Sequence, residues 1–235
     1  MNKSFVILRK ELQSYFRSPL AYIILVATVG IFNIFFFMII DQNNEATLRD
    51  MFKVMEFMFI FIIPLLTMKS FAEEKAAGTM EFLMTTPTKD GAIVLGKYLG
   101  SLAFVLIMIT SGLIYYAVIE YFGHPDRGAV LSGFVGIILE AALFTAVGIM
   151  TSSWTKNQIV AAMSSYVILF LLYFTVSLVK YFHGVPEATI KYLGTWSHME
   201  GLSAGLINAS DLVYYLSGIV FCLLMTRLSL SYAAK

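Results

Sequence analysis

Residues 18–40 read SPLAYIILVATVGIFNIFFFMII, 23 consecutive positions without a charged side chain. A helix needs about 20 apolar residues to cross roughly 30 Å of hydrocarbon, and all its backbone hydrogen bonds must be made within the helix. No small-residue cleavage site follows this run, so it predicts a retained membrane span rather than a signal peptide.

The rest of the chain repeats this pattern. Of 235 residues, 59% are hydrophobic and 13% are charged, whereas about a quarter of the residues are charged in soluble domains. Glu56 and Lys69 limit one further apolar run and Arg227 interrupts another, but both runs can span if these groups sit near an interface. We therefore expect an all-α polytopic membrane protein, one domain over 1–235, with six spans at about 19–40, 51–70, 95–120, 129–152, 158–181 and 211–233.

The distribution of basic residues predicts the orientation. If both termini lie on one side, that side carries 11 of the 16 Lys and Arg residues. Because basic residues concentrate in cytoplasmic loops, both termini are predicted to be cytoplasmic.

The first 17 residues predict a separate helix. Over residues 2–17 the apolar positions recur at helical spacing, and the basic residues on the polar side are Lys3, Arg9, Lys10 and Arg17. This pattern is typical of a helix lying in the membrane interface, and Ser18-Pro19 is a natural break before the first span. The alternative is that these residues simply begin the first span.

The stretch between the last two spans, residues 181–210, is too long for a turn and too apolar for a free linker. Its large apolar residues recur every three or four positions, so it predicts one or two short re-entrant or interfacial helices on the outer side.

The sequence offers little catalytic chemistry. All three histidines fall in predicted outer loops without an HExxH motif, Cys222 is the single cysteine, and no GxxxxGK[ST] phosphate loop occurs. We predict no catalytic residue, no metal site, no cofactor bound by this chain and no nucleic-acid partner.

Glu140 is the one ionisable residue expected near a bilayer midplane, within the sequence GFVGIILEAALFTAVG. A charge there costs a few kcal/mol unless it is protonated, paired or wetted. Glu140 either has a functional role, as a contact for substrate in a transport pathway, a proton site or a hydrogen-bonding group at a subunit interface, or it is a structural group bonded to Ser or Thr of a neighbouring helix. Small residues on the same span predict close helix packing.

A polar segment at residues 69–97, KSFAEEKAAGTMEFLMTTPTKDGAIVLGK, separates two apolar stretches. A return loop needs only about 2–8 residues, so we interpret the segment as a surface for another molecule, with a plain loop as the alternative. Glu74 and Glu81 are seven residues apart and share a helical face, while Phe71 and Ala72 can pack beneath the bundle. Gly78 either ends a short helix or lets another group approach its backbone.

These residues resemble a known signature. Its matching positions are Glu74, Gly78-Thr79, Glu81, Leu83, Pro87 and Gly96-Lys97. They look like the cytoplasmic segment E-x-x-x-G-T-x-E-x-L of type-2 ATP-binding-cassette (ABC) permeases. Residues 148–162 and 198–217 are similar to the same family, and the likeness is greatest to permeases of gliding-motility and nitrous-oxide-reductase-maturation transporters.

The resemblance implies a permease subunit, and not itself an enzyme, of an ATP-driven exporter in the bacterial cytoplasmic (inner) membrane. Residues 71–87 would form a coupling helix docked on a separate cytoplasmic ATPase, which binds the ATP and magnesium. The residues implied in coupling are Glu73, Glu74, Gly78, Thr79, Glu81, Leu83 and Pro87. A second permease chain, identical or pseudo-symmetric, and an accessory periplasmic or membrane subunit are further implied partners.

Two other functions remain open from the sequence. The chain could be a membrane anchor or assembly scaffold whose ATPase performs mechanical work without a translocated substrate. It could also be an ion-coupled carrier. Glu140 alone, without an intramembrane Lys, Arg or His, gives little support to a chain of proton transfers across the membrane.

Overall fold

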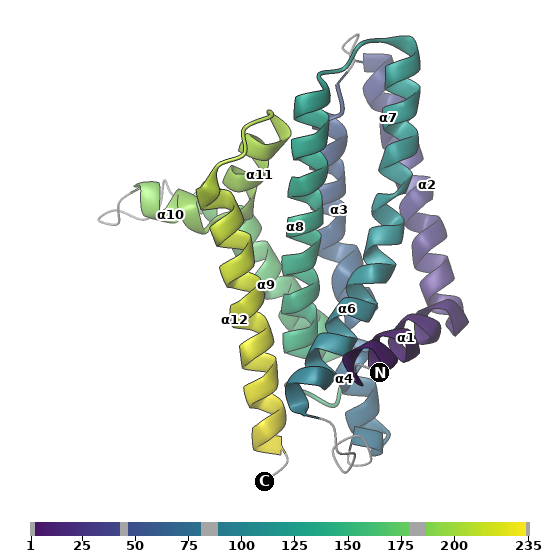
Figure 1. The fold of residues 1–235 in the computed structure, drawn as a ribbon, viewed down its shortest axis with the longest axis vertical. Coiled ribbons are helices and arrows are strands. Elements are labelled where there is room, and N and C mark those ends of the chain that lie inside the picture. The colour runs from purple at the N-terminus through teal and green to yellow at the C-terminus, as the bar shows by residue number, and fades with distance from the viewer. Residues whose placement is uncertain (1–2, 43–46, 81–88, 179–186, 234–235) are drawn as a thin grey trace.

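A computed structural model describes residues 3–42, 47–80, 89–178 and 187–233. Over these residues the chain is helical and contains no strand, and six of its helices are long and apolar enough to cross a membrane. This confirms the expected fold class. The spanning helices are α2 (Pro19–Gln42), α3 (Arg49–Thr67), α6 (Asp90–Ile109) continued by α7 (Ser111–Phe122), α8 (Arg127–Ser152), α9 (Gln158–Leu178) and α12 (Ala209–Ala233) (Figure 1).

Four short helices lie at the two ends of the bundle. At the end where the chain begins and finishes are α1 (Lys3–Arg17) and α4 (Lys69–Ala76) (Figure 1). At the opposite end are α10 (Glu187–Leu193) and α11 (Thr195–Ser203), the short helices expected before the last span. A separate helix α1, turning at Ser18 into a span that starts at Pro19, matches the expected interfacial helix.

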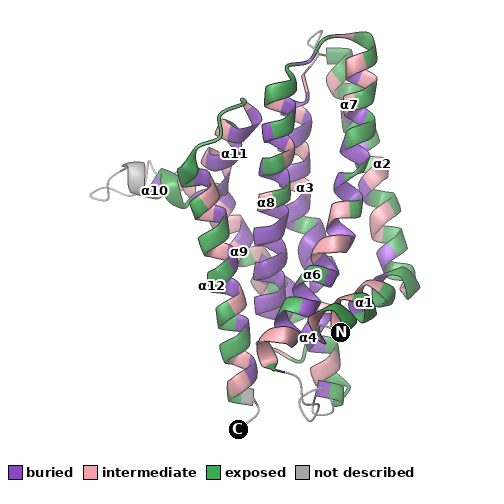
Figure 2. Ribbon diagram, in the orientation of Figure 1, coloured by how far each residue is buried: buried purple, intermediate pink, exposed green. Residues whose placement is uncertain are grey.

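Helix α8 forms the centre of the molecule. Every residue from 141 to 150 is buried (Figure 2). Its glycines allow this packing, since a Cβ at Gly133 would lie 2.1 Å from the Phe52 ring, and one at Gly148 would lie 2.0 Å from the Thr67 hydroxyl. The small residues of this span therefore bring α3 directly against α8, as the sequence predicts.

The outward faces of α2, α9 and α12 carry large exposed apolar side chains, such as Phe37, Val167 and Phe221. On a soluble protein such surfaces would drive association. Helices that face the hydrocarbon of a membrane require such apolar surfaces.

The third span differs from the expected 95–120. It begins at Asp90 and its helix is interrupted at Thr110, where the backbone N–H of Leu113 bonds the Thr110 carbonyl three residues back. This tightening divides the span into α6 and α7. Pro64, inside α3, lacks the N–H that would bond the Ile60 carbonyl, and the next carbonyl, that of Phe61, accepts a hydrogen bond at 3.1 Å from the Tyr166 hydroxyl of α9.

Candidate functional site

Helix α4 follows α3 almost without a break in the chain. It starts one residue after α3 ends, with only Met68 between them, and it is followed by Ala77 and Gly78. Gly78 has a φ of 69°, a conformation that favours glycine, and no atom of the described residues would lie within 4 Å of a Cβ there. Of the two roles considered for Gly78, the structure therefore supports the end of a short helix.

One side of α4 packs under the bundle and the other is open. Ser70, Phe71 and Ala72 are buried, as predicted for the last two, whereas Glu73 and Thr79 are exposed. The helix thus presents a short polar surface at the end of the molecule that carries the termini.

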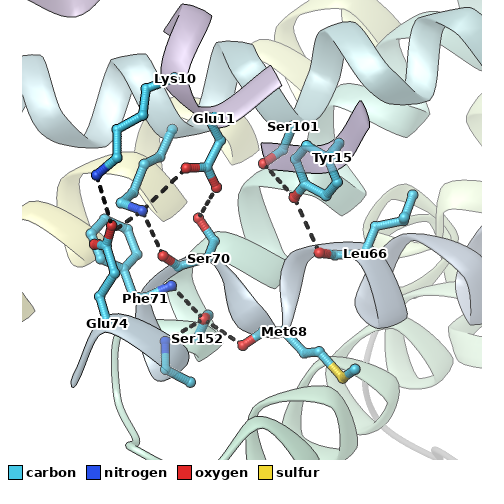
Figure 3. Close-up of polar contacts among 12 residues, drawn as sticks. Lys10, Glu11, Tyr15, Leu66, Met68, Ser70, Phe71, Glu74, Ser101 and Ser152 are labelled. Carbon is cyan, nitrogen blue, oxygen red and sulfur yellow. Dashed lines mark hydrogen bonds and ion pairs between the residues drawn. The ribbon is translucent and has the colours of Figure 1, made fainter. Parts of the chain in front are cut away.

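The start of α4 is bonded to the end of α8 through one hydroxyl. Ser152 Oγ accepts the backbone N–H groups of Phe71 at 3.0 Å and Ala72 at 3.1 Å, and it donates to the Met68 carbonyl at 2.8 Å (Figure 3). The first N–H groups of a helix have no partner within the helix. Ser152 supplies that partner from another span, so α4 is positioned by α8.

A buried ion-pair cluster joins α4 to α1 and α6. Lys97 of α6 has a 3% exposed side chain, and its ammonium lies 3.3 Å from Glu11 of α1 and 3.1 Å from Glu74 of α4. It also donates to the Ser70 carbonyl at 2.6 Å. From the solvent side, Lys10 lies 3.7 Å from Glu74 (Figure 3). We call Glu11, Glu74 and Lys97 the charged junction.

Tyr15 adds an uncharged link beside this junction. Its hydroxyl donates to the Leu66 carbonyl at 3.1 Å and lies 3.0 Å from Ser101 Oγ (Figure 3). Burial, and the nearby Glu11 carboxyl, raise the pKa of the Tyr15 hydroxyl, so it stays protonated and remains a donor. The ring stacks on Phe104 with 5.0 Å between centroids.

Helix α1 can approach α6 because two glycines face it. A Cβ at Gly96 would lie 2.6 Å from the Ile7 Cβ, and one at Gly100 would lie 2.7 Å from the Glu11 Cβ. The Leu8 carbonyl oxygen would be 3.1 Å from the latter. This close approach is what places Glu11 beside Lys97.

The opposite side of α4 contacts the end of α8 again. Lys75 donates to the Ser153 carbonyl, and Ser229 of α12 donates to the same carbonyl at 3.0 Å. Four other elements, α1, α6, α8 and α12, therefore meet at or beside α4.

The structure places some predicted site residues here and others elsewhere. Glu74 belongs to the junction, Glu73 lies on the exposed side of α4, and Gly78 and Thr79 are exposed just after α4 ends. Glu81, Leu83 and Pro87 lie outside the described residues. On α1, the side chains of Arg9, Lys10 and Arg17 are exposed, and that of Lys3 is not described.

The expectation that Glu140 is the single ionisable group in the interior is wrong. Glu56, expected near an interface, is 1% exposed and its carboxyl lies within hydrogen-bonding reach of that of Glu140, which is fully buried. Hydropathy along the chain cannot show which residues of two spans face each other. No bond from Ser or Thr to the Glu140 carboxyl is present among the described residues.

Ser152 provides a direct test of how α4 is held. We expect Ser152→Ala to lower stability by about 1–3 kcal/mol, because it removes the acceptor of the Phe71 N–H group and the hydroxyl that donates to the Met68 carbonyl. The measurement is thermal unfolding of the purified chain in detergent. Ser231→Ala is the matched control, since that hydroxyl bonds only the Leu228 carbonyl of its own helix. Equal midpoints for the two variants would contradict this account of Ser152.

The fold and this junction define a polytopic α-helical membrane protein with a polar helix fixed beneath its bundle. A model of the family described as ABC-2 family transporter protein matches residues 5–232. The chain belongs to this family, and it is therefore a membrane subunit of the permease type, whose general partner is a cytoplasmic ABC ATPase. A comparison with curated proteins finds no match.

Proposed function

We propose that this chain is the permease subunit of an exporter of the gliding-motility or nitrous-oxide-reductase-maturation type. It would act with a second permease chain, identical or pseudo-symmetric, in the bacterial inner membrane, with both termini cytoplasmic. ATP and magnesium would be bound by the separate ATPase. An accessory periplasmic or membrane subunit is a further proposed partner.

The observation that carries this proposal is the attachment of α4. It is bonded to α1 and α6 through the charged junction and to α8 through Ser152, while Glu73 on its other side is exposed. A helix held in this way transmits a push on its exposed face directly to three other elements. That is the mechanical requirement for coupling ATPase closure to rearrangement of the spans.

Glu73 is the residue of choice for testing ATPase docking. Glu74 is less suitable than the sequence suggests, because its carboxylate is engaged by Lys97 and reversing its charge would disturb the junction itself. We expect Glu73→Arg to weaken retention of the ATPase about tenfold, equivalent to about 1.4 kcal/mol, by reversing a charge on the docking face. The fold should be unaffected because Glu73 is exposed.

The measurement uses an ABC ATPase encoded beside this chain, co-expressed and co-purified with it at several salt concentrations. Asp41→Arg is the matched control, since Asp41 is also exposed but lies at the opposite end of the bundle, in the last turn of α2. Retention of the ATPase at wild-type levels by Glu73→Arg would count against docking on α4.

The scaffold alternative is separated by measuring flux. If the chain is only an anchor, the wild-type complex should show no ATP-dependent movement of cargo. Disrupting the junction should then change only the assembly of the complex. A permease instead requires that ATP and cargo favour different conformations of the bundle.

A further inference from the structure

The interior of the bundle contains two carboxyl groups that face each other. Glu56 comes from α3 and Glu140 from α8, and they are 1% and 0% exposed. Their carboxyls lie within hydrogen-bonding reach of each other. Over the described part of the chain, three buried oxygens of the pair have no hydrogen-bond donor: both of Glu140 and Oε1 of Glu56.

Within the described ranges, Lys53 is the one cation whose charge acts on this pair. The charged and titratable groups that act on it or on the tyrosines beside it are Lys53 and Glu200, with Tyr173, Tyr214, Tyr215 and Asp211. Lys53 is the one basic group in this set, and its ammonium is bonded to Asp50 at 2.8 Å. Two ionised carboxylates in contact would repel each other strongly in such a site. A proton bridging them removes the repulsion and supplies the missing donor.

Tyr215 provides a second, independent indication. Its side chain is fully buried on α12, its hydroxyl has no partner among the described residues, and Glu140 and Glu56 are the charges that act on it most strongly. A tyrosine hydroxyl near a carboxylate can donate a hydrogen bond to it. With one proton shared between the carboxyls and the Tyr215 hydroxyl donating to them, these buried polar groups are satisfied.

The residue one turn before Glu56 on α3 lines a pocket at the end of the bundle opposite the termini. A pocket of about 160 Å³ is lined there by Arg49, Asp126 and Phe52, among others. Phe52 precedes Glu56 by one helical turn on α3, and its ring packs edge-on against Phe134 with 5.2 Å between centroids. Phe52 therefore lines the pocket at a position one turn of α3 away from Glu56.

We propose that Glu56 and Glu140 form a proton-binding site that shares one proton and exchanges it with the pocket past Phe52. The step is a simple proton transfer: water in the pocket delivers a proton to a carboxylate oxygen, and loss of that proton returns both groups to the ionised form. Loss of the proton would push α3 and α8 apart. Because α3 leads into α4 and α8 bears Ser152, the site lies between the two helices that hold α4.

The test is infrared spectroscopy of the full chain in nanodiscs, titrated over about pH 5–9, a range in which perturbed carboxyls change state. The wild type should show a protonated-carboxyl band at neutral pH that fades as pH rises. The band should be lost in the double variant Glu56→Gln with Glu140→Gln, and shifted in Tyr215→Phe, which keeps the ring and removes the hydroxyl. Glu73→Gln, at an exposed position, is the control and should leave the band unchanged.

Three results would overturn the proposal. The first is a wild-type spectrum identical to that of the double variant. The second is a band that stays constant over the whole titration, which would show a permanently protonated pair. The third is loss of the band on adding sodium chloride at fixed pH, which would identify a sodium site. The route is tested separately by hydrogen–deuterium exchange of the band, which should be several-fold faster in Phe52→Leu, and an unchanged rate would exclude passage by Phe52.

Discussion

Replacing Lys97 with methionine is expected to destabilise the protein by about 3–5 kcal/mol, the cost of removing one partner from a buried ion pair. Methionine has a similar length but leaves Glu11 and Glu74 facing each other without the ammonium, and frees the Ser70 carbonyl. Unfolding in detergent should shift to lower temperature, and the coupling of ATPase activity to cargo that we propose for α4 should be lost.

The controls separate charge from packing. Lys156→Met removes an exposed lysine near the same end of the bundle and should change stability little. Adding Glu11→Gln and Glu74→Gln to Lys97→Met should recover much of the lost stability, because no uncompensated charge then remains buried. A triple variant as unstable as the single one would show that Lys97 acts by filling space.

Gly100→Leu is expected to release α1 from the bundle. A Cβ alone would lie 2.7 Å from the Glu11 Cβ and 3.1 Å from the Leu8 carbonyl oxygen, and a backbone atom cannot rotate away as a side chain can. Overpacking of this kind typically costs about 1–3 kcal/mol. Here the response we expect is for α1 to move off, since a single residue, Ser18, separates it from α2 along the chain.

Release of α1 can be measured by labelling. Ser101 is 2% exposed beneath Tyr15, so a cysteine placed there, in a Cys222→Ser background, should react slowly with a maleimide in the parent and rapidly in Gly100→Leu. Gly91→Leu is the matched control on the same helix, since no atom of the described residues lies within 4 Å of its Cβ position. Equal labelling rates in the two leucine variants would contradict the assigned role of Gly100.

Sequence reasoning succeeded where a property runs along one segment. The apolar runs predicted the six spanning helices, and the amphipathic pattern followed by Ser18-Pro19 predicted α1 and its end. These features depend on local composition and on the lack of helix propensity before proline.

The sequence failed where two distant segments must face each other. Glu11 and Lys97 are 86 residues apart, and nothing in their local surroundings indicates that they pair. Glu56 was expected near an interface because it falls within the first turns of the span at about 51–70, whereas the rotation of α3 directs it towards Glu140. Hydropathy gives the length of a span but not the direction in which each of its faces points.

The attachment of α1 to α6 also has a consequence for biosynthesis. The first helix leaves the ribosome early, but the surface that receives it, with Gly96, Lys97 and Gly100, is made only after three spans have begun. Until then an amphipathic α1 can rest on the membrane surface, where Glu11 is hydrated by water. Insertion of α6 then allows α1 to dock and the Glu11–Lys97 pair to close. The ribosome must therefore synthesise the 86 positions that separate Glu11 from Lys97 before α1 can reach its final place.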